Sequence, residues 1–159
     1  MKTTIEEAKE EIHNKLVHNL QELLSKNYDA EKGFKKAISD AKDTKLKDFL
    51  KNQVVRHNHF ATEIDKEIRL LNEHPIEKSN TEGNLHRAWM DLVSTFSKHN
   101  DETILEECLR GEKAAENEYE HKLEKGHFPP HIKDILKNQL QEIKDTLKKV
   151  KSLKDLASN

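Results

Sequence analysis

Several ionisable side chains stand at positions of this sequence where the neighbouring residues are apolar, and these are the side chains able to do chemistry. Glu31 falls between Leu24 and Ile38 on one face of a helix with about 100° per residue. Glu112 falls in the same way one turn after Cys108. A buried carboxylate without a partner is costly, so each position predicts either a binding site or an internal network of hydrogen bonds.

Two other segments carry polar side chains on their apolar faces. Gln53 and His57 lie among residues such as Leu50 and Phe60, and Gln139 lies on the apolar face of the last long segment. Counted from the predicted turns between helices, Glu31, His57 and Glu112 come near the middle of a bundle. The pattern therefore predicts that polar groups from four helices meet at one level.

Glu31, His57 and Glu112 would together form a metal site. Carboxylates and an imidazole inside a helix bundle are the ligands of di-metal carboxylate proteins, so iron or manganese is the expected cofactor. Gln53 and His86 are candidates near that site. The di-metal pattern also requires Glu-x-x-His on two helices, which the predicted core positions lack. A structural hydrogen-bonded network is therefore the alternative interpretation.

The other reactive side chains favour structural roles. Cys108 has no basic neighbour that would activate its thiol, and Trp89 and Tyr119 occupy apolar faces typical of core residues. The sequence contains no phosphate-binding loop, nucleophile elbow or cysteine pair. We therefore predict no catalytic residue, and an enzyme is the less favoured class.

Helices must position these residues. Apolar spacing and capping residues predict five of them, over residues 12–41, 44–71, 80–97, 101–127 and from 130 past 150. Four are long, and the one that carries Trp89 is short. Two long hairpins joined through a short helix predict a ferritin-like four-helix bundle with a crossover, and an up-and-down array of five helices is the alternative.

Composition agrees with an all-α fold. The 159 residues are enough for one domain, which we expect to span residues 1–159. Hydrophobic residues make up 33% and charged residues 36%, which suits amphipathic helices because each needs only one apolar stripe. Only four Gly and three Pro leave little material for the turns of a β protein.

Charge and targeting signals exclude several partners. The 28 Lys and Arg nearly balance the 30 Asp and Glu, so neither nucleic acid nor an anionic membrane is an expected partner. The lone Cys108 and the absence of a signal peptide or a long apolar stretch predict a cytoplasmic protein. A homo-oligomer is expected through Leu153 and Leu156 on an extended fifth helix, or through the flanks of the Trp89 helix. No other protein partner is indicated.

Five segments together carry a family resemblance. They are YDAEKGF at 28–34, HFATEI at 59–64, LHRAWMDL at 85–92, ILEECLRGE at 104–112 and the Phe-Pro-Pro turn at 128–130. In this order and spacing the chain resembles a bacterial family of four-helix-bundle proteins of unknown function within the ferritin-like superfamily. The resemblance implies a ferritin-like bundle with a crossover, and it places Glu31 and Glu112 in recurring motifs.

Two functions of different class follow from these observations. The favoured one is a binding or structural module without conventional catalysis, for example in a stress response. The alternative is a ferritin-like protein that binds iron or manganese, or an oxidase, with an incomplete ligand set. The number of carboxylates and imidazoles that converge in the bundle distinguishes them.

Overall fold

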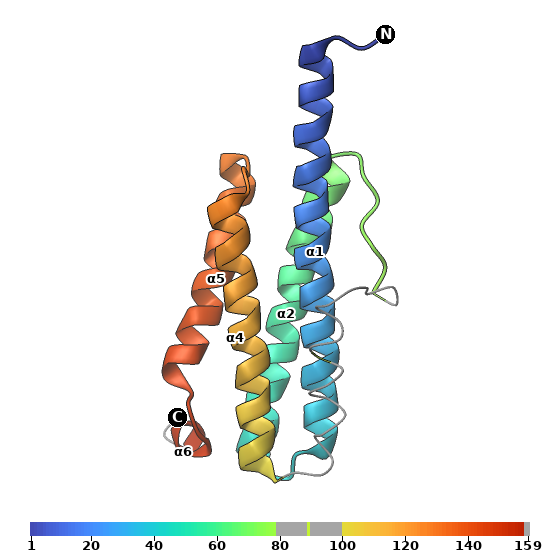
Figure 1. Cartoon of the computed structure of the whole chain (residues 1–159). Coiled ribbons are helices and arrows are strands. Elements are labelled where there is room, and N and C mark those ends of the chain that lie inside the picture. Colours follow the sequence, from blue (N-terminus) through green and yellow to red (C-terminus); the bar gives the residue numbers. More distant parts are fainter. Residues whose placement is uncertain (79–88, 90–99, 158–159) are drawn as a thin grey trace.

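The computed structural model describes residues 1–78, 89 and 100–157, and every regular element in these residues is a helix. The helices are α1 (Thr4–Asp40), α2 (Thr44–Leu70), α4 (Asp101–Lys125), α5 (Pro130–Lys149) and the short α6 (Leu153–Ala157). The four long helices lie side by side in one bundle (Figure 1). The predictions of an all-α fold and a helical bundle are therefore confirmed for the described residues. Within this part of the chain no helix is both long and apolar enough to cross a membrane.

The first helix begins earlier than the apolar spacing predicts. The Thr3 hydroxyl accepts a hydrogen bond from the backbone N–H of Glu6, and the Glu6 carboxylate accepts one from the backbone N–H of Thr3. This reciprocal cap starts the helix ahead of its buried apolar face, which begins at Leu16. α1 therefore begins at Thr4 rather than near Ile12.

The last helix ends earlier than predicted. α5 stops at Lys149, and Val150 adopts an extended conformation. The chain then turns, and the short α6 packs Leu156 into the core of its own chain, with Leu153 partly buried beside it. The expectation that these two leucines extend the fifth helix towards a second copy is therefore wrong.

The connection between the two hairpins runs along the bundle. At one end, His13 of α1 contacts Glu73 just after α2, with 3.2 Å between His13 Nε2 and Glu73 Oε1. The chain then passes back along α1, where Lys32 Nζ lies 2.6 Å from the backbone oxygen of Lys78.

α4 begins at the opposite end of the bundle from that contact. There the Asp101 carboxylate accepts hydrogen bonds from the backbone N–H groups of Lys42 and Asp43, in the turn between α1 and α2. Consequently α2 and α4 run parallel, as Figure 1 shows, and the chain must cross the length of the bundle between them. This geometry fits the predicted crossover, and it also fits the alternative of an up-and-down array of five helices, in which the second and fourth helices are parallel as well. The predicted short helix over 80–97 lies outside the described residues except for Trp89.

The apolar core is divided into two clusters by a polar layer. One cluster contains α1 residues from Leu16 to Leu24, and the other contains α1 residues from Ala30 to Ala37. Asn27, His57 and Glu112 are buried at the level between the clusters, on α1, α2 and α4. The layer therefore spans three helices at the middle of the bundle.

Trp89 is buried between α1 and α4, as predicted for a core residue. A Cβ atom built on Gly33 of α1 would lie 2.1 Å from Trp89 Cε3, and one on Gly111 of α4 would lie 2.5 Å from Trp89 Cζ2. Both positions therefore need glycine to admit the indole ring. Phe34 packs against Trp89 on one side and stacks on His57, with ring centroids 5.2 and 5.6 Å apart.

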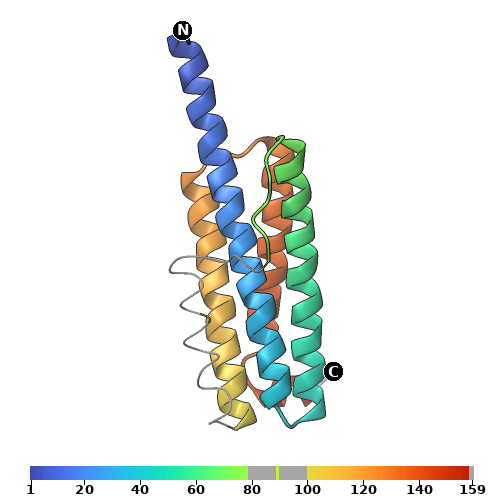
Figure 2. The same cartoon turned by 90° about the vertical axis from the view of Figure 1, so that its right-hand side faces the viewer.

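The first turns of α1 project beyond the rest of the bundle (Figure 2). His13 is level with the end of α2, so the residues before it have no neighbouring helix in the part of the chain that the structure describes. Ile5 and Ile12 are 69% and 62% exposed there. Residues 4–14 are called the overhang below.

Candidate functional site

The centre of the polar layer is a hydrogen-bonded pair of His57 and Glu112. His57 is wholly buried on α2, Glu112 is 1% exposed on α4, and His57 Nε2 lies 2.7 Å from Glu112 Oε1. The other ring nitrogen, Nδ1, lies 2.7 Å from Oδ1 of Asn27 on α1. The imidazole is therefore held from both sides by oxygen atoms.

Asn27 determines where the His57 protons lie. Its Nδ2 is 2.8 Å from the backbone oxygen of Leu23, and a carbonyl oxygen can only accept a hydrogen bond. The amide nitrogen must face Leu23, so Asn27 Oδ1 faces His57 and accepts from Nδ1–H. A single further proton lies between His57 Nε2 and Glu112, giving either an ion pair or a neutral imidazole that accepts from a carboxylic acid.

The network continues from Asn27 to α5. Asn27 Nδ2 also donates to the Tyr119 hydroxyl at 2.8 Å, and that hydroxyl donates to Gln139 Oε1 at 2.6 Å. Gln139 Nε2 donates to the backbone oxygen of Phe60 at 3.3 Å and to Glu63 Oε1 at 3.1 Å. The donor and acceptor of each hydrogen bond in this series are fixed, because the series ends on carbonyl and carboxylate oxygens, which can only accept.

The interior around the pair is poorly solvated. Burial raises the pKa of the Tyr119 hydroxyl, against the opposing effect of its hydrogen bond with Asn27, so Tyr119 stays a donor at neutral pH. Burial also raises the pKa of the Cys108 thiol, and the charge of Glu112 raises it further. Cys108 is therefore a packed thiol rather than a nucleophile, in agreement with its apolar position.

Lys26 brings a positive charge towards the same layer. Its side chain is almost wholly buried on α1, and burial lowers its pKa. The carboxylates of Glu118, Asp29 and Glu112 oppose that shift and favour the charged amine. An ammonium group near Glu112 helps to balance the buried carboxylate.

Glu31 takes part in a different arrangement. It is 3% exposed, and its Oε2 lies 2.6 Å from Nζ of Lys78, in the segment that follows α2. Its Oε1 lies 3.5 Å from Nζ of Lys35 and accepts a hydrogen bond from Asn58 Nδ2 at 3.2 Å. Two lysines therefore neutralise this carboxylate from the surface side.

The structure thus brings together only part of the predicted metal site. His57 and Glu112 contact each other, whereas the recorded partners of Glu31 are Lys78, Lys35 and Asn58. Across residues 1–78, 89 and 100–157, no group of three or more His, Cys, Asp or Glu side chains is placed to hold a metal ion. Metal binding by Glu31, His57 and Glu112 remains a prediction.

Gln53, one of the two secondary candidates, has a recorded partner outside the pair. Gln53 is buried, and its Oε1 accepts a hydrogen bond from Arg56 at 3.3 Å. Arg56 itself reaches across to Thr146 and Glu142 of α5. His86 lies outside the described residues.

Asn27 is the member of the network that sequence reasoning missed. It follows Leu20 and Leu23 at helical spacing and precedes Phe34 by seven residues, so the periodicity that marked Glu31 also places Asn27 inward. Asparagine is common on exposed helix faces and at caps, which makes its burial less conspicuous than that of a glutamate.

One family model matches the chain. Its description is a domain of unknown function, DUF2383, and it covers residues 15–125, from the first turns of α1 after the overhang to the end of α4. Asn27, His57, Glu112 and Tyr119 lie inside the match, whereas Gln139 and the overhang lie outside it. No curated protein matches the sequence. Because the matched span exceeds half of its length, the chain belongs to the DUF2383 family of unknown function.

Proposed function

We propose that this protein is a binding or structural module without conventional catalysis, in which the buried polar network fixes how the helices pack. The supporting observation is the closed hydrogen bonding of His57, whose two ring nitrogens both face oxygen atoms inside the bundle. A catalytic imidazole needs access to a substrate, and this ring has less than 2% of its side chain exposed.

Hydrogen-bond geometry also supports the structural role. A metal ion bound by both His57 Nε2 and Glu112 Oε1 at about 2.0–2.2 Å would hold these atoms roughly 3 Å or more apart. They lie 2.7 Å apart, a distance typical of a strong hydrogen bond. Buried networks of this kind make helix register specific, since a shifted helix would leave several donors without acceptors.

A ferritin-like metal protein is the second candidate. Its support is the connection that runs the length of the bundle between α2 and α4, a feature compatible with ferritin-like bundles, and the second oxygen of Glu112. Glu112 Oε2 is buried and has no hydrogen-bond partner within the part of the chain that the structure describes. An unpartnered carboxylate oxygen in a bundle is a suitable ligand for iron or manganese, with His57 or Glu31 as further donors.

Metal analysis of purified protein combined with thermal melting distinguishes the two functions. The structural module should contain no stoichiometric metal, and iron, manganese or zinc should leave its Tm unchanged. A metalloprotein would show a metal-dependent rise in Tm by mass action, which Glu112→Ala and Glu31→Ala would abolish. The matched control is His59→Ala, since His59 is 66% exposed on α2. A metal-dependent shift that is lost in the two glutamate variants and kept in the control would overturn the structural proposal.

A further inference from the structure

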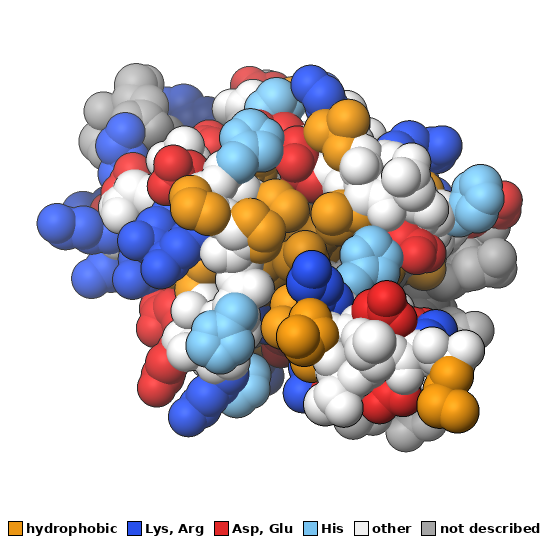
Figure 3. Space-filling view, turned by 90° about the horizontal axis from the view of Figure 1, so that it is seen from above, with side chains coloured by type: hydrophobic (Ala, Val, Ile, Leu, Met, Phe, Trp, Pro, Cys, Tyr) orange, Lys and Arg blue, Asp and Glu red, His pale blue; other side chains and the backbone are white. Residues whose placement is uncertain are grey.

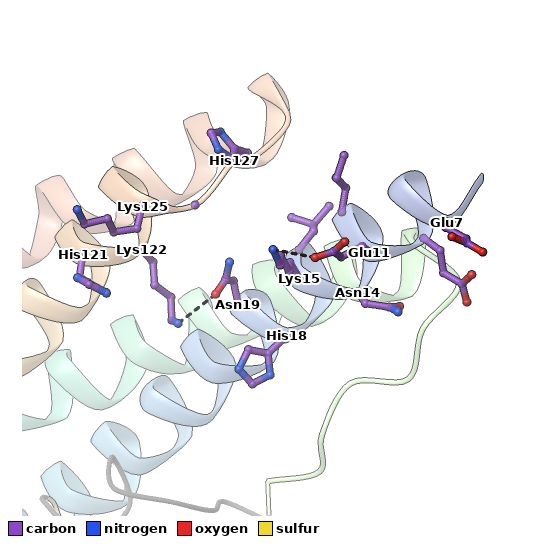
Figure 4. Close-up of a pocket in the computed structure, with 14 residues that line it drawn as sticks. Glu7, Glu11, Asn14, Lys15, His18, Asn19, His121, Lys122, Lys125 and His127 are labelled. Carbon is purple, nitrogen blue, oxygen red and sulfur yellow. Dashed lines mark hydrogen bonds and ion pairs between the residues drawn. The ribbon is translucent and has the colours of Figure 1, made fainter. Parts of the chain in front are cut away.

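The overhang and the adjoining end of α4 enclose a cavity at one end of the bundle. Its volume is about 880 Å³, and α1 residues from Glu7 to Asn19 form one wall. The end of α4 and the following turn, residues 121–127, form the other wall and are called the shoulder (Figure 4). Figure 3 shows hydrophobic side chains gathered at this end, with charged and histidine side chains around them.

The overhang and the shoulder differ in charge, and Lys15 and His18 of α1 line the cavity beyond the overhang. The overhang contributes acidic side chains to the cavity, and the shoulder contributes basic and imidazole side chains, namely Glu7, Glu10 and Glu11 on the overhang and His121, Lys122, Lys125 and His127 on the shoulder. Residues 4–14 contain four glutamates and one lysine. A helix with the negative charge of the overhang would therefore be electrostatically complementary to the shoulder.

The overhang also continues the apolar stripe of the core. Leu16 is 8% exposed and belongs to the core, whereas Ile12 and Ile5, on the same face about one and three turns earlier, are mostly exposed. Among the described residues nothing covers them. A stripe at this spacing is typical of a helix that packs against another helix.

We propose that this surface joins two copies of the chain, with the two overhangs packed antiparallel and the tip of each directed into the cavity of the other. Ile5 and Ile12 would then be buried at the contact, and the glutamates of one overhang would face the shoulder of the other copy. This assembly is separate from the buried network and does not depend on the proposed function.

Electrostatics and size favour this arrangement over others. A parallel pair would place the acidic overhangs beside each other and bring the two bundles into collision, whereas an antiparallel pair puts the bundles at opposite ends. A stable interface buries about 800 Å² on each partner, more than two helices of some 15 Å supply alone. The contact with the shoulder must therefore contribute, and the dimer should weaken in high salt.

Sedimentation of the full chain over a range of concentrations tests the proposal. A reversible dimer is expected at tens of micromolar in low salt, with less dimer in high salt. The double variant Ile5→Glu and Ile12→Glu should weaken dimerisation by about tenfold or more, because two apolar side chains lose their contact. Its Tm at a concentration where both proteins are monomeric should match that of the parent, since both positions are exposed.

Cross-linking tests the antiparallel geometry. A Glu7→Cys variant mixed with a Lys125→Cys variant should give an interchain product with a short bismaleimide, because the partner's overhang lies against the shoulder. Val55→Cys in place of Lys125→Cys is the control, as Val55 is exposed elsewhere, on α2. A strict monomer at tens of micromolar would overturn the proposal. So would a dimer that the double variant leaves intact, or equal cross-linking in the control.

Discussion

Glu112 and Glu31 are both buried glutamates on the inner faces of long helices, yet their surroundings differ. Glu112 meets His57, which is equally buried and is itself held by Asn27. Glu31 meets Lys78 and Lys35, whose side chains are 41% and 57% exposed. The recorded partner of one carboxylate lies inside the bundle, and the lysine partners of the other reach it from the surface.

This difference determines what each pair contributes. A lysine that reaches in from solvent can be replaced by water or another cation, so its loss costs little. A buried partner cannot be replaced in that way, and its loss leaves a polar group unsatisfied in a poorly solvated interior. Glu112 and His57 should therefore control stability and packing, whereas Glu31 and its lysines should have a modest, salt-dependent effect.

The largest effect is expected for His57→Ala. It removes the partner of Glu112 and leaves the buried carboxylate uncompensated, which should lower the free energy of unfolding by about 3–5 kcal/mol. Chemical denaturation at neutral pH measures it. His59→Ala is the control and should change stability by less than about 0.5 kcal/mol. Equal effects of the two variants would show that the buried pair has no special role.

The next largest effect on stability is expected for substitution of the glycines beside Trp89. Gly33→Ala places a methyl group against the indole ring and should destabilise the protein by about 1–3 kcal/mol, although alanine is the better helix former. In a Trp89→Ala background the same change should become neutral or stabilising, because the clash is gone. The test is the sign of the change in the free energy of unfolding that Gly33→Ala causes in each background. A loss of stability in both would contradict the close packing of Trp89 against Gly33.

The dependence of stability on alkaline pH should reveal the poorly solvated environment near Glu112. Burial raises the pKa of Cys108 above its ordinary value of 9.0, so above that pH the unfolded chain releases a proton that the folded chain keeps. Stability therefore falls as pH rises, by about 1.4 kcal/mol per pH unit for one group. Cys108→Ala should remove this slope between about pH 9 and 10, the window below Tyr ionisation in the unfolded chain. An unchanged slope would mean that the thiol is not protected from ionisation.

Tyr119→Phe should have a smaller effect. It removes the hydroxyl between Asn27 and Gln139 and leaves Gln139 Oε1 without its donor, at a cost of about 1–2 kcal/mol. The change should couple to Gln139→Leu in a double-mutant cycle, since both act on one hydrogen bond. Additive effects would argue against a connected network.

The smallest effect is expected for Lys78→Met. Lys35 and Asn58 remain beside Glu31, so the free energy of unfolding should fall by less than about 1 kcal/mol, and less still in high salt. Unfolding curves at two salt concentrations measure it. A loss as large as that of His57→Ala would remove the distinction between the two glutamates.

Local signals in the sequence were sufficient to locate where the helices begin. Asp43 and Asn100 cap α2 and α4, and Pro130 opens α5, because caps and proline act on backbone groups within a few residues. The same kind of signal, Thr3 with Glu6, started α1 early, ahead of its buried apolar face. The end of α5 could not be predicted in this way, since α6 is held by packing of Leu156 against distant residues.

The sequence by itself also determined that Glu31, His57 and Glu112 are buried, because helical periodicity decides which face a residue takes. Only the tertiary structure decided which of them meet. Partner choice depends on the relative height and rotation of separate helices and on the path of the crossover, which carries Lys78 to Glu31. A periodic pattern contains no information about a contact between side chains 55 residues apart, such as His57 and Glu112, until the helices are packed.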